Sequence, residues 1–176
     1  KHDCTQMITT LKIQPEAEIS TPAKEAILQS DTIILGPGDL YTSLLANFTV
    51  KGAKQALSSS KAQFIYITNL MSKYGQTHGM TARDHVEEVA KYTGRYPDKI
   101  IVSNDPLSKS ILQRYERECA YPVTDDLSPD YDDVTIRENI ISRTVVRKIK
   151  GDTINRSLIR HDSFKLAKIL ESIISK

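Results

Sequence analysis

Short apolar runs alternate along the chain with segments in which apolar residues recur at helical spacing. The runs at 32–35, 64–68 and 99–103 are dominated by Ile, Leu, Val, Phe and Tyr. Such continuous runs are typical of strands buried on both faces of a parallel sheet. Helical spacing follows at 81–93 and again from Pro106 onward. The alternation predicts an α/β fold, a Rossmann-like three-layer α/β/α arrangement with a mostly parallel sheet.

Capping residues and chain breakers indicate further elements. Thr21 is the expected N-cap of a helix that reaches residue 30, with Pro22 at its first position. Asp162 is a suitable N-cap for a final helix that ends near Ile174. The remaining predictions are strands over 9–13 and 142–149, helices over 40–47 and 52–59, and a helix from 106 with Cys119 on its apolar face.

Composition and charge narrow the class of protein. The chain has 176 residues, which suits one domain of ordinary size. Lys and Arg number 24 against 22 Asp and Glu, a balance that gives no sign of nucleic-acid binding. No stretch of about 18 residues is free of charge, so no membrane-spanning helix is predicted. No segment resembles an export signal and only two cysteines are present, so we expect a cytoplasmic protein without a disulfide framework.

Metal-binding patterns are absent from the sequence. The four histidines and two cysteines lack the spacing of a zinc site. The acidic run 125–133 lacks the glycine and the ligand spacing of a calcium-binding EF-hand loop. The sequence therefore predicts no metal site, and a solvent-exposed loop at the acidic run.

The turn I-L-G-P-G-D-L-Y-T-S at 34–43 is the first candidate site. Gly36 and Gly38 let the backbone approach a ligand closely, and a helix that follows would present free N–H groups to an anion. The pattern lacks the third glycine of a dinucleotide fingerprint and the lysine of a P-loop. An ordinary turn with Asp39 as N-cap is therefore an open alternative. The hydroxyl donors of the next turn belong to Tyr41, Thr42 and Ser43.

A long polar loop that leads from the second apolar run into a helix is the second candidate. Loops positioned by a rigid scaffold often carry function, and this one offers groups that could bind a base or a sugar. Each group also has a plain structural reading. Asn69 could shape a turn, Asp84 could complete a capping box with Thr81, and His85 could be an ordinary helix histidine. The hydrogen-bonding side chains are those of Asn69, Gln76, Thr77 and His78.

The run R-H-D at 160–162 is the third candidate. Arg160 carries a planar guanidinium group that could bind a phosphate through two hydrogen bonds. The alternative is that Asp162 caps the final helix and Arg160 belongs to the basic stretch 137–160. Without further information, the sequence of this run favours the capping and basic-stretch reading over phosphate binding.

These three motifs, taken in order, resemble one protein family. The run G-P-G-D-L-Y-T-S-L-L-A-N at 36–47 resembles the G-P-G-S-L-Y-T-S-x-x-P-N signature of YvcK-type gluconeogenesis factors. These proteins belong to the superfamily of the 2-phospho-L-lactate transferase CofD. The run from Asn69 to His85 resembles that group's N-x-M-T-Q-x-G-E-T-x-G-x-x-x-x-D-H, and the R-H-D run before a helix is similar too.

The resemblance implies a ligand-binding site built from all three motifs. The first motif would line a nucleotide or diphosphate. Asp39 stands where the family usually has Ser, and Lys73 where it usually has Gln. No catalytic residue is implied. The implied ligand-binding residues are Gly36, Gly38, Asp39, Tyr41, Thr42, Ser43, Asn47, Asn69, Thr77, Gly79, Asp84, His85 and Arg160.

The function implied by the resemblance is a cytoplasmic regulator that binds a UDP-sugar or related nucleotide. It would be linked to carbon metabolism, the cell wall and cell shape. The alternative is a CofD-like transferase that moves a phospholactyl group from a nucleotide diphosphate, with Mg²⁺ as cofactor and Asp39 or Asp84 positioning the metal. A third reading is a half-domain that serves in homo-oligomer formation or docking.

The family's glycine-rich G-G-G-T-G turn has no counterpart in this sequence. We therefore expect residues 1–176 to form either a single α/β domain or the C-terminal half of a larger CofD-like domain. In the second case, the fold would be incomplete relative to that of the full family.

Overall fold

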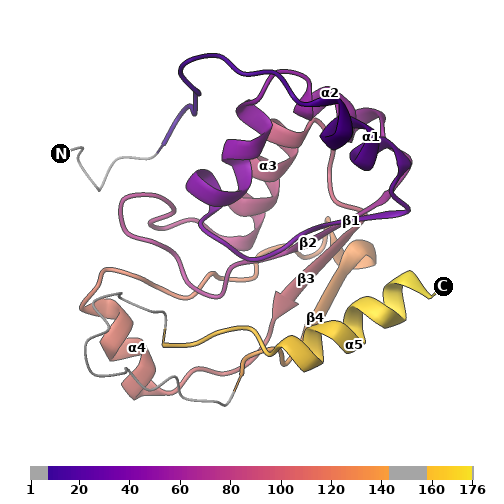
Figure 1. Ribbon diagram of the computed structural model, residues 1–176. Coiled ribbons are helices and arrows are strands. Elements are labelled where there is room, and N and C mark those ends of the chain that lie inside the picture. Colours follow the sequence, from indigo (N-terminus) through magenta and orange to yellow (C-terminus); the bar gives the residue numbers. More distant parts are fainter. Residues whose placement is uncertain (1–7, 143–157, 176) are drawn as a thin grey trace, which may run out of the picture.

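A parallel sheet forms the centre of the computed structural model, which describes residues 8–142 and 158–175. Within these residues, four strands follow one another in the order β1-β2-β3-β4, each parallel to its neighbour (Figure 1). The register pairs Ile34 with Ile65, and Ile67 with Ile101. The predicted α/β fold with a parallel sheet is confirmed. The strands are β1 (Thr32–Leu35), β2 (Gln63–Ile67), β3 (Lys99–Ser103) and β4 (Thr135–Glu138).

Helices connect the strands and follow the last of them. The predicted capping box of α3 is present, with Thr81 and Asp84 each bonding the other's backbone. Asp162 caps α5 as predicted, because its carboxylate accepts hydrogen bonds from Phe164 N and Lys165 N. The α-helices are α1 (Thr21–Gln29), α2 (Ala53–Ser59), α3 (Ala82–Thr93), α4 (Lys109–Glu116) and α5 (Ser163–Ile174). The shorter helical turns are η1 (Leu40–Leu44), η2 (Leu45–Thr49) and η3 (Asp132–Val134).

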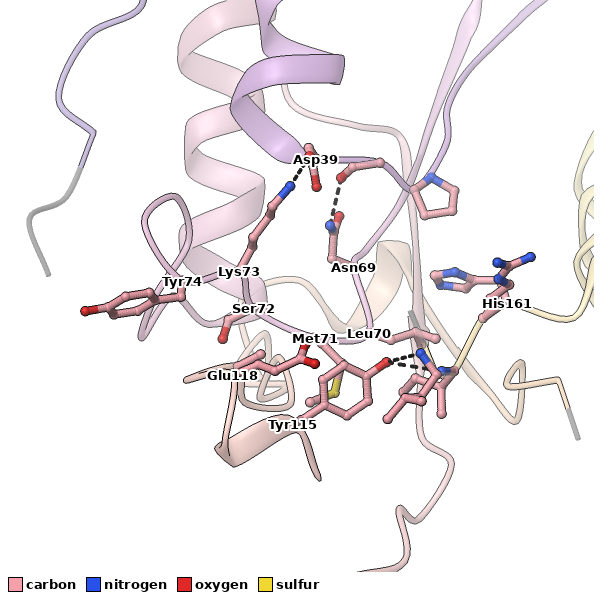
Figure 2. A pocket seen from close by; sticks show the side chains of 16 residues that line it. Asp39, Asn69, Leu70, Met71, Ser72, Lys73, Tyr74, Tyr115, Glu118 and His161 are labelled. Carbon is pink, nitrogen blue, oxygen red and sulfur yellow. Dashed lines mark hydrogen bonds and ion pairs between the residues drawn. The ribbon is translucent and has the colours of Figure 1, made fainter. Parts of the chain in front are cut away.

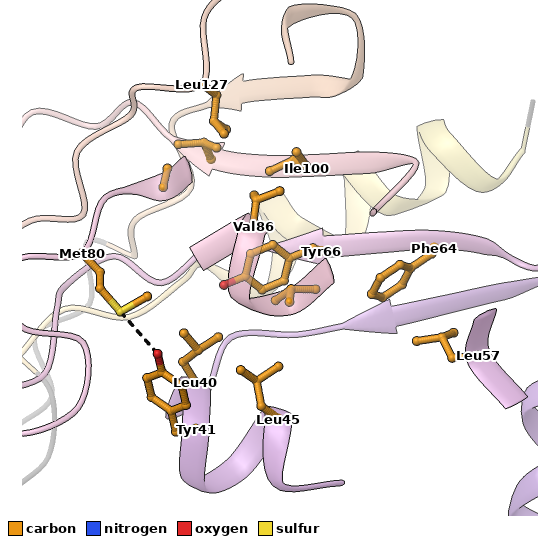
Figure 3. Packing of buried hydrophobic residues seen from close by; sticks show 13 residues of the cluster. Leu40, Tyr41, Leu45, Leu57, Phe64, Tyr66, Met80, Val86, Ile100 and Leu127 are labelled. Atoms are coloured by element: carbon orange, nitrogen blue, oxygen red, sulfur yellow. Dashed lines mark hydrogen bonds between the residues drawn. The ribbon is translucent and has the colours of Figure 1, made fainter. Parts of the chain in front are cut away.

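The sheet has an apolar cluster on each of its two faces. Helices cover both clusters, so the sheet and the helices form the three layers of the predicted α/β/α arrangement. Because successive side chains of a strand point to opposite faces, Phe64 and Tyr66 face α2 and α3 while Ile65 and Ile67 face α5. Figure 3 shows the larger cluster, in which Tyr66 and Val86 lie close together and the turns that follow β1 contribute Leu40, Tyr41 and Leu45. Figure 1 shows α1, α2 and α3 on one side of the sheet and α5 on the other. Burial of both faces explains why the strand sequences are continuously apolar.

Several predicted elements are wrong. Residues 9–13 form no strand, since Leu11 N donates to Tyr92 Oη (2.8 Å) instead of to another strand. Residues 40–47 are helical as predicted, but they belong to the π-helical η1 and the 3-10 helix η2 and not to one α-helix. Ser20, rather than Thr21, caps α1.

Two other differences concern the second half of the chain. Cys119 is not part of the core face of α4, because the helix ends at Glu116 and Cys119 has a φ of 52°. The strand β4 was not predicted, because its sequence T-I-R-E has a single large apolar residue. The predicted strand over 142–149 lies, after Ser142, outside the described residues.

The acidic run 125–133 is held against two arginines. Arg137 forms ion pairs with Asp125 (2.5 Å) and Asp132 (2.9 Å), and Arg83 with Asp130 (2.8 Å). The hydrogen bond from Ser128 and the nearby Arg137 lower the pKa of Asp132. The run is therefore a largely exposed loop in which two arginines pair with three of the five aspartates, while Leu127 within it is fully buried. No helix within the described residues is long and apolar enough to cross a membrane.

Candidate functional site

A cavity of about 910 Å³ opens where β1 and β2 end. Ligands of open parallel sheets bind beyond the carboxyl ends of the strands, so the position is the expected one. Figure 2 shows the walls of the cavity. They are formed by the loops after β1 and β2, by helix α4 and by the segment before α5. The lining residues of polar or charged character are Asp39, Asn69, Ser72, Lys73, Tyr74, Tyr115, Glu118, Arg160 and His161.

Asn69 ties the loops after β1 and β2 together. Its Nδ2 donates to the carbonyl oxygen of Gly38 (2.8 Å), 31 positions earlier in the chain. Its Oδ1 is buried and has no hydrogen-bond partner among the residues that the structure describes. A buried acceptor without a partner is costly unless something donates to it. The Asn69 Oδ1 atom is therefore an unpaired acceptor in a residue that lines the cavity.

Asp39 and Lys73 connect the same two loops through an ion pair. The Lys73 ammonium group contacts Asp39 Oδ2, and the two side chains are 52% and 38% exposed. Thr42 Oγ1 also donates to Asp39 Oδ2 at 3.5 Å. Asp39 occupies the N-cap position of η1, but its side chain makes no capping hydrogen bond, so the capping role predicted as the alternative is not the one observed.

Tyr115 of α4 holds the segment that precedes α5. Its phenol oxygen accepts hydrogen bonds from the backbone N–H groups of Leu158 (2.9 Å) and Ile159 (3.1 Å). The next residue, Arg160, has an exposed side chain that makes no hydrogen bond or ion pair with any described residue. Tyr115 thus fixes the backbone from which a free guanidinium group reaches the cavity.

His161 presents a neutral imidazole. Its Nε2 lies 3.2 Å from the carbonyl oxygen of Thr68, and since a carbonyl can only accept, Nε2 carries the proton. Burial lowers the pKa of His161, and the hydrogen bond to Thr68 opposes that shift only in part. The Nδ1 atom then remains an acceptor for a ligand hydroxyl or N–H.

The structure brings together four of the residues expected to bind ligand. Gly38, Asp39, Asn69 and Arg160 line one cavity, although Arg160 lies more than 90 positions after each of the others. The capping part of the alternative reading is confirmed, since Asp162 caps α5, while Arg160 lines the cavity. Whether these residues bind a ligand stays a prediction.

The other residues of the first motif lie elsewhere. Tyr41 is buried in the larger apolar cluster, with its hydroxyl 3.9 Å from Met80 Sδ, and burial raises its pKa. Asn47 donates to the carbonyl oxygens of Ser43 and Leu44 and so stabilises its own turn. None of these residues lines the cavity, and the same holds for Gly36, Thr42 and Ser43.

The end of the second motif also has a structural role. Thr77 Oγ1 accepts from Lys73 N (2.9 Å), which shapes the loop, and Gly79 has a φ of 76°, a value that favours glycine. His85 is fully buried in α3, with Nδ1 2.7 Å from the Thr81 carbonyl oxygen. Burial lowers the pKa of His85. Asp84 serves in the capping box.

Sequence reasoning missed Tyr115, Glu118 and His161. His161 stands inside the R-H-D motif, so the motif offered a signal that could have been used. Tyr115 of α4 and Glu118 of the turn after α4 carry no local signal, because only the tertiary structure brings them to the cavity. Among the described residues, no group of three or more His, Cys, Asp and Glu side chains could hold a metal ion.

Comparison with known proteins places the chain in a family. The model of the 2-phospho-L-lactate transferase CofD family matches residues 1–144. The chain belongs to the CofD family. A relative from Thermotoga maritima is 38% identical over 149 residues, which cover 85% of this chain and 46% of the relative. The gluconeogenesis factor of Bacillus subtilis is 31% identical over 173 residues, 97% of this chain and 52% of that protein.

A solved structure from Bacillus halodurans shows the same fold. It superimposes with a TM-score of 0.78 at 30% sequence identity, and the match covers 94% of this chain and 51% of that one. The resemblance to gluconeogenesis factors of the CofD family, stated from three motifs, is thereby confirmed. The chain spans about half the length of the relatives it matches.

Proposed function

We propose that this CofD-family chain binds a UDP-sugar or a related nucleotide sugar in the cavity at the ends of β1 and β2, as a cytoplasmic regulator of the gluconeogenesis-factor type. The observation that carries the proposal is the convergence of Asn69 and Arg160 on one cavity. One offers a buried acceptor without a partner and the other a free guanidinium group. A nucleotide sugar needs both kinds of contact.

The proposed contacts follow from the chemistry of each group. Arg160 binds the diphosphate, because its planar donors match phosphate oxygens. Asn69 Oδ1 and His161 Nδ1 accept from the hydroxyl or N–H groups of the sugar or base. The cavity volume of about 910 Å³ lies within the range of roughly 300–1,000 Å³ that small-molecule sites occupy.

The wider role rests on the relatives. The Bacillus subtilis and Halalkalibacterium halodurans proteins are named gluconeogenesis factors. A regulatory role in carbon metabolism is therefore part of the proposal for this chain, together with the links to the cell wall and cell shape that the resemblance of the motifs implies.

Calorimetric titration of UDP-N-acetylglucosamine, with and without Mg²⁺, tests the proposal. We expect saturable binding that is lost in Arg160→Ala. The matched control is Arg114→Ala, since Arg114 is exposed on α4 and does not line the cavity. Equal affinity of the two variants would contradict the assignment of the site. Absence of binding by the well-folded chain would contradict nucleotide-sugar binding, and turnover of a nucleotide diphosphate with Mg²⁺ would instead support a transferase.

A further inference from the structure

The ion pair between Lys73 and Asp39 lies in the wall of the cavity and joins two separate loops. Asp39 follows β1 and Lys73 follows β2, and Figure 2 shows their charged groups meeting above Asn69. Both side chains are partly exposed, at 52% for Lys73 and 38% for Asp39. Exposed pairs of this kind are weak, so a stronger anion that enters the cavity can compete for the ammonium group.

The charged residues of the cavity show why release of Lys73 would matter for binding an anion. Its lining contains two cations, Lys73 and Arg160, and two carboxylates, Asp39 and Glu118. Arg160 has no partner among the described residues, whereas Lys73 is engaged by Asp39. A ligand with one negative charge can be served by Arg160 alone. A diphosphate needs a second cation, and Lys73 is the lining residue that can supply it.

We propose that Lys73 is an exchangeable anion-binding residue, held by Asp39 until the diphosphate group of a ligand competes for its ammonium group. The proposal rests on the proposed function, because it names the residue that completes the diphosphate contact in the same cavity. Asp39 competes with the phosphate groups of the ligand for Lys73 and so lowers the affinity of the cavity for anions. Because a diphosphate competes with Asp39 more strongly than a monophosphate does, the pair favours ligands with two phosphate groups.

Asp39 and Lys73 carry charges of opposite sign, and the structure shows these charges in contact. The pair also accounts for a carboxylate at a proposed diphosphate site, since Lys73 compensates its charge.

Titration of inorganic diphosphate into the 176-residue chain tests the exchange. Asp39→Asn frees Lys73, and we expect about threefold tighter binding, the size of a weak exposed ion pair. Lys73→Met removes the cation, and we expect about tenfold weaker binding, as for one charge-assisted phosphate contact. The double variant is expected to match Lys73→Met, because Asp39 acts through Lys73. The matched control is Glu18→Gln, which breaks the exposed Glu18–Lys51 pair outside this cavity.

Three results would overturn the exchange. Weaker binding by Asp39→Asn would mean that the carboxylate supports the ligand, for example through a metal ion. An equal gain from Asp39→Asn with and without Lys73 would mean a general field effect. No binding of diphosphate by the unchanged chain would remove the basis of the proposal. Circular dichroism verifies the fold of each variant, and Lys73→Arg, which keeps the charge, is expected to retain binding if Lys73→Met unfolds.

The two proposals can fail separately. If diphosphate affinity follows the expected order but UDP-N-acetylglucosamine binds no more tightly than diphosphate, the exchange stands and nucleotide-sugar binding fails. If UDP-N-acetylglucosamine binds tightly and its affinity is the same in Lys73→Met, nucleotide-sugar binding stands and the exchange fails.

Discussion

Asn69 donates a hydrogen bond from Nδ2 to the carbonyl oxygen of Gly38 at 2.8 Å, and this single contact joins the loops that follow β1 and β2. The same side chain leaves its Oδ1 buried without a partner at the cavity wall. One amide therefore joins two loops and, among the described residues, keeps an unpaired acceptor beside the cavity.

Asn69→Asp is expected to lower the free energy of unfolding by about 1–2 kcal/mol. The carboxylate keeps the shape of the side chain but has no donor for the Gly38 carbonyl oxygen, and a partly buried acceptor is left unpaired. Urea denaturation measures the change. Asn104→Asp is the control, since Asn104 is exposed, and we expect a change below about 0.5 kcal/mol there. Equal stability of the two variants would contradict the role of the Gly38 bond.

Tyr115→Phe is expected to loosen the segment that carries Arg160. The ring keeps its packing, but the N–H groups of Leu158 and Ile159 lose their acceptor. We expect faster amide hydrogen exchange at both residues and weaker UDP-N-acetylglucosamine binding. Tyr121→Phe provides the control, because the Tyr121 side chain is 43% exposed. Unchanged exchange at Leu158 and Ile159 would show that the phenol oxygen does not hold the segment.

Asp84→Ala is expected to reduce stability by about 1 kcal/mol and to leave ligand affinity unchanged. The substitution removes half of the capping box at the start of α3, and Asp84 does not line the cavity. Thermal unfolding and calorimetry on the same preparation measure both quantities. A loss of affinity without a loss of stability would support instead the metal-positioning role that the transferase reading gives to Asp84.

Stability is expected to fall as the pH is lowered below about 6.5, the ordinary pKa of histidine. Burial lowers the pKa of His85 and of His161 in the folded state, so the unfolded chain takes up protons first as the pH falls. Above about pH 6.5 both states are neutral at these residues, and their effect disappears. Urea denaturation between about pH 5 and 7.5 measures the slope, and His85→Gln should flatten it. An unchanged slope in that variant would exclude His85 as the cause.

Local sequence was sufficient for much of the scaffold. The strands β1 and β3 have the predicted bounds, β2 begins one residue earlier than predicted, and α3 and α5 begin at their predicted caps. Each of these elements is determined by residues near in sequence, either a continuous apolar run or a capping side chain. The same local information did not predict the conformation of residues 9–13. Their sequence is typical of a strand, but they do not pair with another strand.

The site was less predictable because its residues are distant in sequence. Tyr41, Thr42 and Ser43 follow each other, but the turn that begins with two bonds to the Asp39 carbonyl oxygen turns Tyr41 into the core and leaves the other two exposed. A hydroxyl group in a motif therefore need not face a ligand. Its direction depends on the geometry of the turn, which the pattern of residue types does not specify.

The sequence by itself determined the parallel α/β class, the main strands and helices and the family, because periodicity, caps and motif order are local properties of the chain. The tertiary structure alone decided that Asp39 contacts Lys73, that Tyr115 holds the backbone before Arg160, and that these residues share a cavity. Such contacts depend on how the loops at the ends of parallel strands are brought to one edge of the sheet. That arrangement follows from packing of the whole domain and is not encoded in any single segment.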